Sequence, residues 1–162
     1  MLGQDLSETR FHLRSGTDAL GRIYAIAGVR LGSETALVER FDPSNPSAGW
    51  VFGPSLNQKR QLATASTDGD GSIYALGGWG PGFLSSVEVY DPVGDKWLVH
   101  SNMNRSINGI ASAFDSVGRL YAVGGHDLSV AKSGVERVPE PTVLALLSVG
   151  VSMVLVRRSK RC

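Results

Sequence analysis

The sequence is poor in several features by which small proteins hold a fold or bind a cofactor. Its only cysteine is the last of 162 residues, Cys162, so the chain has no internal disulfide and no cysteine-based metal site. The formal net charge is only +1 at pH 7, and binding to a phosphate backbone requires a basic face, so nucleic acid is not an expected partner. Residues 1–6 contain neither a basic segment nor an apolar run, so they do not form a signal peptide.

The sequence also lacks a group of residues with the spacing of a catalytic or metal site. The histidines, His12, His100 and His126, are not spaced as metal ligands, and we interpret them as separate surface residues. The aspartates of residues 68–71 suggest a calcium loop, but Ile73 stands where an EF-hand loop requires glycine, so a strand turn is favoured. No nucleophile–base pair or carboxylate pair stands out. We therefore predict no catalytic residue, no metal and no cofactor.

One eleven-residue pattern occurs three times, at residues 18–28, 68–78 and 115–125. Each copy reads Asp-x-x-Gly-x-(Ile/Leu)-Tyr-Ala-aliphatic-(Ala/Gly)-Gly, and the tyrosines of successive copies are 50 and 47 residues apart. A repeat of this length is typical of a propeller blade. Asp-x-x-Gly predicts a tight turn, and the short run after it predicts a strand that is too brief for a helix.

Other segments recur in register with this pattern. Residues 36–43 and 86–92 each predict a strand that Asp-Pro ends. A tryptophan strand follows in both repeats, and runs of small residues at 63–66 and 111–113 lead into the next turn. Residues 11–13 are interpreted as a poor first strand. Residues that recur in every blade indicate packing between blades rather than a unique site; these are Tyr24, Tyr74 and Tyr121, Trp50 and Trp97, and Glu39, Glu88 and Glu136.

The order of these segments resembles the Kelch motif over roughly residues 10–138. The resemblance implies a β-propeller of four-stranded blades, with repeats at about 10–57, 58–104 and an incomplete 105–138. Arg105 is similar to the arginine near the end of that motif, with Lys59 or Arg60 as its counterpart. The first repeat departs from the pattern by having Ala27 before Gly28, and the third lacks the Asp-Pro and tryptophan segments.

Two and a half blades do not close a ring, because propellers need roughly four to eight. An open array would expose a blade face and strand edges. Three interpretations remain open: the chain is part of a longer product whose start lies upstream, two chains assemble one ring, or the sequence is a decayed fragment. The missing signal peptide favours the first.

The composition changes at Val138. Pro139, Glu140 and Pro141 are followed by an apolar run at 142–156 and by basic residues that include Arg157, Arg158 and Arg161. Fifteen helical residues span about 22 Å, less than the roughly 30 Å bilayer core, but the basic cluster is typical of a stop signal behind a membrane span. Residues 139–162 resemble the PEP-CTERM sorting signal of bacterial envelope proteins, which implies export, recognition by an exosortase and removal or exchange of the tail.

We therefore expect an all-β fold of Kelch-type propeller blades, an incomplete ring within this chain, followed by a single C-terminal transmembrane helix. Residues 1–138 form the repeat region, and residues 139–162 the sorting signal with its span at 142–156. The expected function is a binding or scaffold protein of the bacterial cell envelope, exported, membrane-anchored, and released to the surface or matrix after processing. Its ligand is a protein or a polysaccharide, contacted by the loop that contains Trp79 and Phe83.

The alternative is a carbohydrate-active propeller enzyme that resembles sialic-acid mutarotases or galactose-oxidase-like copper proteins, with its catalytic residues outside this sequence. Copper-radical chemistry of the second kind requires a cysteine crosslinked to tyrosine. The one cysteine, Cys162, lies behind the expected membrane segment. This position excludes copper-radical chemistry for this chain, and a non-enzymatic protein is favoured overall.

Overall fold

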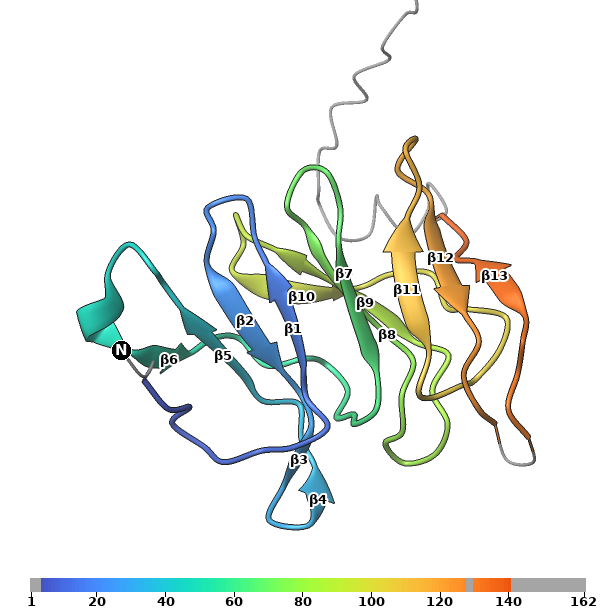
Figure 1. Cartoon of the computed structure of the whole chain (residues 1–162), viewed down its shortest axis with the longest axis horizontal. Helices are drawn as coiled ribbons and strands as arrows, with labels where there is room; N and C mark the ends of the chain where they lie inside the picture. Colours follow the sequence, from blue (N-terminus) through green and yellow to red (C-terminus); the bar gives the residue numbers. More distant parts are fainter. Residues whose placement is uncertain (1–3, 128–129, 141–162) are drawn as a thin grey trace, which may run out of the picture.

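A computed structural model describes residues 4–127 and 130–140 of the chain (Figure 1). In this part the protein is built from short antiparallel strands, and its one helical element is the 3₁₀ turn η1 (Pro46–Ala48). The strands form three main sheets and one small hairpin. We call the three sheets blade 1, blade 2 and blade 3.

The strands of each blade follow the repeats of the sequence. Blade 1 consists of β1 (Arg14–Thr17), β2 (Ile23–Ile26), β5 (Val38–Phe41) and β6 (Trp50–Phe52), with the hairpin β3 (Val29–Arg30) and β4 (Ser33–Glu34) in its second loop. Blade 2 consists of β7 (Thr64–Thr67), β8 (Ile73–Leu76), β9 (Val87–Asp91) and β10 (Lys96–Val99). Blade 3 consists of β11 (Ala111–Phe114), β12 (Leu120–Val123) and β13 (Val135–Arg137).

The Asp-x-x-Gly segments form the turns that the sequence predicts. In each blade the aspartate carboxylate accepts hydrogen bonds from backbone amides two and four residues further on, and a glycine closes the turn with a positive φ. The glycines are Gly21, Gly71 and Gly118, with φ values of 78°, 83° and 82°. Glycine adopts this left-handed conformation without the steric penalty of a side chain.

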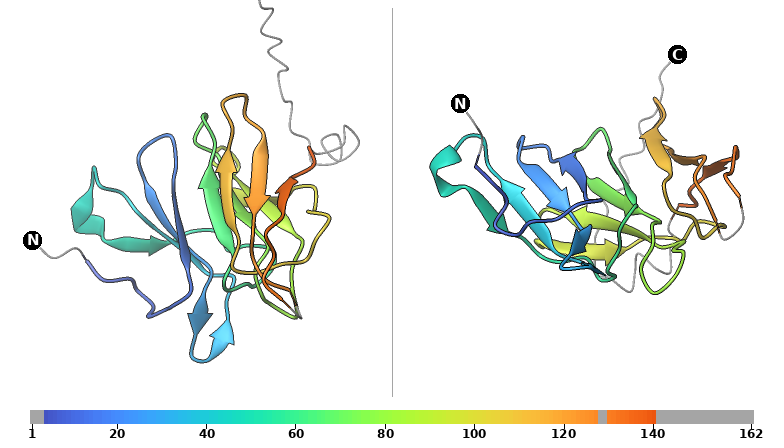
Figure 2. Two further views of the ribbon diagram at one scale, coloured as in Figure 1. Left: turned by 45° about the vertical axis from the view of Figure 1, so that its right-hand side comes forward. Right: turned by 60° about the horizontal axis from the view of Figure 1, so that its bottom comes forward.

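The blades stand side by side, and their first strands lie next to one another with β7 between β1 and β11 (Figures 1 and 2). The two spaces between blades contain the two hydrophobic cores. The core between blades 1 and 2 includes Ile26, Val38, Ile73 and Trp97. Alternate residues of a strand point to opposite faces, so blade 2, the middle blade, contributes one face to each core.

The expected C-terminal transmembrane helix is a wrong prediction. The described residues form an all-β structure, and no helix in residues 4–127 and 130–140 is long and apolar enough to cross a membrane. The predicted span at 142–156 lies outside the described residues. The physical weakness of the prediction is its length, because fifteen residues make a helix about 22 Å long against a bilayer core of roughly 30 Å.

The first strand of blade 1 also differs from expectation. It begins at Arg14, and Phe11 makes only an isolated bridge to Val29. His12 has a φ of 55°, which interrupts an extended strand at the point where the sequence predicted one. The repeat boundaries at 10–57, 58–104 and 105–138 stay a prediction; the three sheets lie within them.

Candidate functional site

Blades 1 and 2 each contain a buried ion pair between the repeated glutamate and an arginine. Arg10 Nη2 lies 2.9 Å from Glu39 Oε1, and Arg60 Nη2 lies 2.6 Å from Glu88 Oε1, with all four side chains almost fully buried. The guanidinium groups also donate to backbone carbonyls, Arg10 to that of Leu37 in blade 1 and Arg60 to that of Ser86 at the matching position in blade 2. Burial lowers the pKa of both arginines, and the paired carboxylates counteract this. These glutamates therefore serve blade structure, as their recurrence predicts.

Blade 3 departs from this arrangement. The backbone of Arg60 accepts from Gly28 and donates to Thr35, and in the next blade these hydrogen bonds are made by Ile107, which accepts from Gly78 and donates to Leu84. The structural counterpart of Arg60 is therefore Ile107. The sequence had instead matched Arg105 to Lys59 or Arg60.

Arg105 reaches the blade 3 glutamate from another position. Its Nε lies 3.3 Å from Glu136 Oε2, and its side chain is 38% exposed. The Asn104 amide also donates to Glu136. Arg105 and Ile107 both lie in the segment between β10 and β11. The residue pattern alone did not show which of the two corresponds to Arg60.

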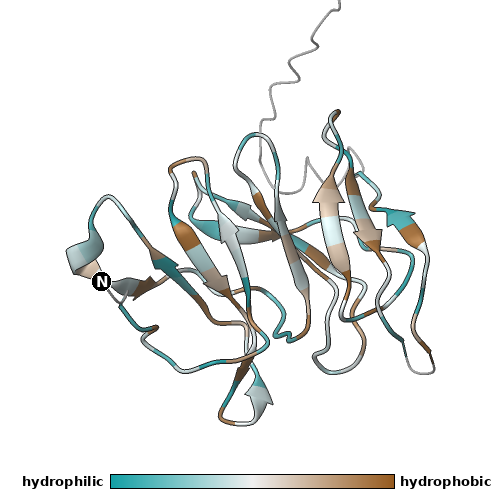
Figure 3. Cartoon of the chain, in the orientation of Figure 1, coloured by the Kyte–Doolittle hydropathy of each residue, from teal (hydrophilic) through white to brown (hydrophobic). Residues whose placement is uncertain are grey.

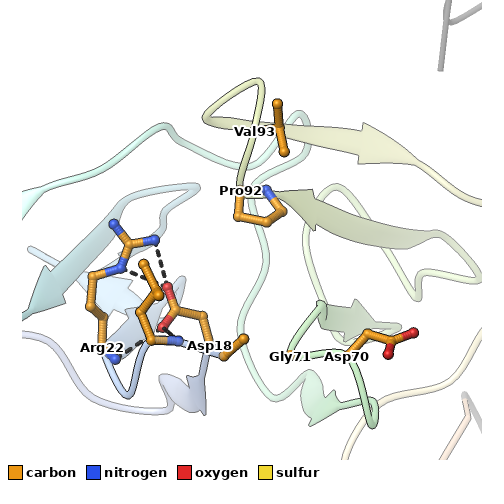
Figure 4. Close-up of a pocket in the computed structure, with 8 residues that line it drawn as sticks. Asp18, Arg22, Asp70, Gly71, Pro92 and Val93 are labelled. Atoms are coloured by element: carbon orange, nitrogen blue, oxygen red, sulfur yellow. Dashed lines mark hydrogen bonds and ion pairs between the residues drawn. The ribbon is translucent and has the colours of Figure 1, made fainter. Parts of the chain in front are cut away.

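The end of the blades that carries the Asp-x-x-Gly turns, which we call the turn end, contains a pocket. It holds about 350 Å³ and lies between the turns of blades 1 and 2 (Figure 4). On one side Asp18 accepts from Arg22 and Tyr24, and on the other lie Gly71 and Pro92. Burial raises the pKa of Asp18, but the hydrogen bonds from Arg22 and Tyr24 outweigh it and lower that pKa.

Two charged groups of this pocket are thus paired with each other. Arg22 and Asp18 form an ion pair at 2.6 Å, and the opposite wall presents the exposed side chain of Val93. Because Asp18 is held by hydrogen bonds within the blade 1 turn, we assign this pocket a structural role. Tyr24 and Tyr74 have the packing role predicted for the repeated tyrosines. Across the blade interfaces the Tyr24 ring contacts Tyr90, and the Tyr74 ring contacts Phe114, each with ring centroids 5.1 Å apart.

The opposite end, which we call the loop end, contains three matching ladders of isolated bridges. Val29 pairs with Phe11, Trp79 pairs with Gln61, and His126 pairs with Asn108. The same three positions pair on their other side with Glu34, Phe83 and Ala131. The backbone geometry repeats while the side chains differ from blade to blade. Recognition residues are expected where repeats share a backbone but differ in side chain, so these positions form our candidate binding surface.

The blade 2 and blade 3 part of the loop end is aromatic. The rings of Trp79 and Phe83 meet edge to face at 4.8 Å, and Phe83 lies 6.0 Å from the ring of His126 in the next blade. Trp79 and Phe83 are half-buried and His126 is exposed. The structure thus places the predicted residues Trp79 and Phe83 in direct contact. Their role in binding stays a prediction.

The blade 1 part of the loop end is polar. Gln61 contacts both His12 and Glu34 at 3.1 and 3.3 Å, and Glu34 also lies 3.7 Å from the Lys59 ammonium group. The exposed ring of Phe11 packs against His12 at 4.8 Å. Sequence reasoning missed Phe11, His12 and Gln61 as part of this surface, because nothing in the spacing brings residue 12 to residue 61. The packing of blade 2 against blade 1 brings these two residues together.

The predicted sorting motif begins where the last strand ends. Val138 is buried in the core between blades 2 and 3, and its amide donates to Leu120. Pro139 is half-buried and Glu140 is exposed, and the Glu140 carbonyl accepts from Ser101 Oγ at 3.0 Å. Pro141, Arg157, Arg158 and Arg161 lie outside the described residues, so their predicted role is not examined by this structure.

The remaining predicted residues are far apart. His12 and His126 lie at the loop end and His100 packs on Tyr74. Within residues 4–127 and 130–140 no three His, Cys, Asp or Glu side chains gather in a way that could hold a metal ion.

Sheets of this topology, standing side by side around their first strands, define a β-propeller-like protein. Comparison with known families identifies the Kelch motif at residues 68–104, which contain strands β8, β9 and β10 of blade 2 and the turn before them. The chain is 33% identical to human Kelch-like protein 23 over 114 residues, 68% of this chain and 20% of that protein. It is 35% identical to human Kelch repeat and BTB domain-containing protein 13 over 112 residues, 67% of this chain and 24% of that protein.

A third relative, human Kelch-like protein 34, is 33% identical over 93 residues, 56% of this chain and 14% of that protein. The chain spans about a fifth of the length of the curated relatives it matches. These matches support a Kelch-repeat protein, and Kelch repeats suggest a protein-interaction scaffold. They are compatible with a protein that is not an enzyme.

Proposed function

We propose that this chain is a binding module whose loop end holds a protein ligand, with Trp79 and Phe83 as its apolar anchors. The observation that carries the proposal is the contrast between the two ends of the blades. At the turn end the polar groups are paired in a repeated pattern, whereas the loop end presents different side chains on one repeated backbone. Aromatic residues are enriched among the residues that dominate binding energy at protein interfaces.

The composition of the surface favours a protein over a small ligand. An exposed Phe11 and the half-buried Trp79 and Phe83 provide apolar contacts, and Glu34 with Lys59 provides a charged margin. A protein interface typically combines an apolar centre with a polar rim. Trp79 and Phe83 lie in a loop of blade 2, and Glu34 lies in the neighbouring loop of blade 1. A ligand that spans blades 1 and 2 therefore contacts both the aromatic and the charged residues.

The test is site-specific photo-crosslinking in cells of the source organism. A photoreactive side chain at Phe83 is expected to capture a protein, and the same side chain at Val93, which is 96% exposed at the turn end, is expected to capture none. A Trp79→Ala substitution should abolish the adduct at position 83. Equal capture from both positions, or capture that Trp79→Ala leaves unchanged, would rule out the loop end as the binding surface.

For the targeting of the protein, we propose that residues 138–162 act as an exosortase sorting signal that directs it to the bacterial cell envelope. The support is the sequence pattern and the position of Pro139 and Glu140, which leave the last strand at the surface of blade 3. The mass of the mature protein from cells tests this. We expect a chain that has lost the residues after the motif, and an unprocessed chain for Glu140→Ala. Ser101→Ala removes only the contact with the Glu140 carbonyl and should be processed normally. An intact tail on the wild-type protein would contradict the proposal.

A further inference from the structure

The last blade exposes residues that the first two blades bury. Register places Val123 of β12 at the same position as Ile26 and Leu76, and it places Val135 of β13 at the position of Val38 and Val87. The four residues of blades 1 and 2 are at most 2% exposed, whereas Val123 is 40% and Val135 is 63% exposed. Figure 3 shows apolar segments, coloured brown, on the last two strands of the array.

In blades 1 and 2 these positions pack against the following blade. Ile26 and Val38 belong to the core shared with blade 2, and Leu76 and Val87 belong to the core shared with blade 3. The tyrosines behave in the same way, because the Tyr24 ring contacts Tyr90 and the Tyr74 ring contacts Phe114 of the following blade. Tyr121 is the matching residue of blade 3 and is half-buried. Together with Val123 and Val135 it forms what we call the tail face.

Blade 1 presents the complementary surface. Leu56, Ile73, Tyr90 and Trp97 are the blade 2 side of the first core, and all are at most 5% exposed. Register and spacing match them to residues of blade 1 that are each only half-buried: Leu6, Ile23, Phe41 and Trp50. We call these four residues the head face.

The backbone extends this match. The Gly28 amide donates to Arg60 of the following blade segment, and the Gly78 amide donates to Ile107. The Leu56 amide donates back to Ala36, and the Met103 amide donates back to Ser85. In blades 3 and 1, the groups that match the first hydrogen bond are the Gly125 amide and the Arg10 carbonyl. The groups that match the second are the Leu6 amide and the Ser133 carbonyl.

We propose that the tail face of one copy of this chain binds the head face of a second copy. In this arrangement Tyr121 stacks on Phe41 of the second copy, and Val123 and Val135 pack against its Leu6 and Ile23. A head-to-tail interface is heterologous and makes a ring when the rotation closes. Two copies contribute six blades, which lies within the roughly four to eight that close a propeller.

The test uses the full chain in sedimentation velocity over a range of protein concentrations. We expect a dimer, and we expect Val135→Glu to shift it to monomer because the carboxylate would be buried against an apolar surface. Val93→Glu is the matched control, since Val93 is exposed at the turn end and belongs to neither face. Circular dichroism shows whether each variant retains its strands.

Crosslinking tests the direction of the contact. In a Cys162→Ser background, Leu6→Cys and Ser133→Cys are prepared separately and treated with a short thiol crosslinker. A crosslinked dimer is expected only when the two variants are mixed. A monomeric wild-type protein, a dimer that Val135→Glu leaves intact, or crosslinking of Ser133→Cys to itself would overturn the proposal; the last two results would indicate association through another surface or a symmetric contact.

Discussion

Arg60 joins two blades at once: its guanidinium pairs with Glu88 of blade 2 at 2.6 Å, while its backbone is hydrogen-bonded to blade 1. The Arg60 amide donates to Thr35, and its carbonyl accepts from Gly28. Both charged side chains are within 2% of full burial. Glu88 also accepts from the backbone amides of Asn57 and Gln58, which lie with Arg60 in the linker between β6 and β7. The carboxylate therefore fixes the linker between blades as well as the arginine.

Removing one partner of this pair should be costly. Arg60→Ala leaves the Glu88 charge buried without its cation, and breaking a buried pair in this way typically costs about 3–5 kcal/mol of unfolding free energy. Arg105→Ala is the control, since that side chain is 38% exposed and exposed pairs contribute about 0–1 kcal/mol. Urea unfolding of both variants measures the difference. Equal losses for the two substitutions would contradict the assignment of Ile107, rather than Arg105, as the counterpart of Arg60.

The closing glycine of the Tyr-Ala strand is required by a close contact as well as by its conformation. Gly78 has a φ of 101°, and a Cβ there would lie 2.6 Å from the Gln61 carbonyl oxygen. Gly78→Ala should therefore destabilise the protein by more than about 1 kcal/mol. Gly82 lies in the same loop with open space around it and no positive φ, so Gly82→Ala should leave the thermal midpoint nearly unchanged. A similar fall for both variants would show that the contact at Gly78 is not the cause.

Hydroxyl groups connect the first strands of blades 2 and 3. Ser112 Oγ lies 2.7 Å from Ser66 Oγ and 3.1 Å from Thr64 Oγ1. Ser112→Ala removes both contacts and should cost about 1 kcal/mol, the usual contribution of a hydrogen bond. Ser116→Ala in the exposed β11–β12 turn is the control. Chemical denaturation distinguishes them, and no difference between the two variants would show that this contact does not stabilise the blade interface.

The sequence predicted the parts of the fold that depend on local chemistry. Turn formation by Asp68 and a strand at Tyr74 follow from residues close together in the chain, and both are present. The contact between Trp79 and Phe83 could also have been predicted, because they are only four positions apart in the chain. The proximity of His12 to Gln61 was not. It depends on how one blade sits against the next, which no local pattern specifies.

The misassigned arginine has the same origin. Linkers between blades carry few repeated residues, so an alignment by residue type placed Arg105 opposite Arg60. The hydrogen bonds instead place Ile107 there. An apolar residue at that position leaves Glu136 with only a partly exposed cation. The predicted transmembrane helix failed for a different reason: hydropathy and a basic cluster describe composition, and the run was too short for the geometry that the prediction required.

His100 gives the protein a predicted dependence of stability on pH. Its ring packs edge to face on Tyr74 at 5.5 Å, and its Nδ1 lies 3.4 Å from the Ser101 carbonyl. Burial lowers the pKa of His100, while the Ser101 carbonyl and the negative charge of Glu140 act in the opposite direction without reversing it. Tyr74 is uncharged over the relevant range, because burial, followed by the charges of Asp68 and Glu140, raises its pKa to about 12.

A histidine whose pKa is lower in the folded than in the unfolded state binds protons more readily when unfolded. Its contribution to stability is therefore complete above the ordinary histidine pKa of about 6.5 and is lost as the pH falls below it. We expect the difference in unfolding free energy between the wild-type protein and His100→Gln to shrink between pH 7.5 and 5.5. His126→Gln, at an exposed position, is the matched control. Glu140→Gln should make the decline steeper, because the carboxylate that favours the protonated ring would be gone. A difference for His100→Gln that grows as the pH falls would mean that His100 is stabilised in its charged form, contrary to its burial against Tyr74.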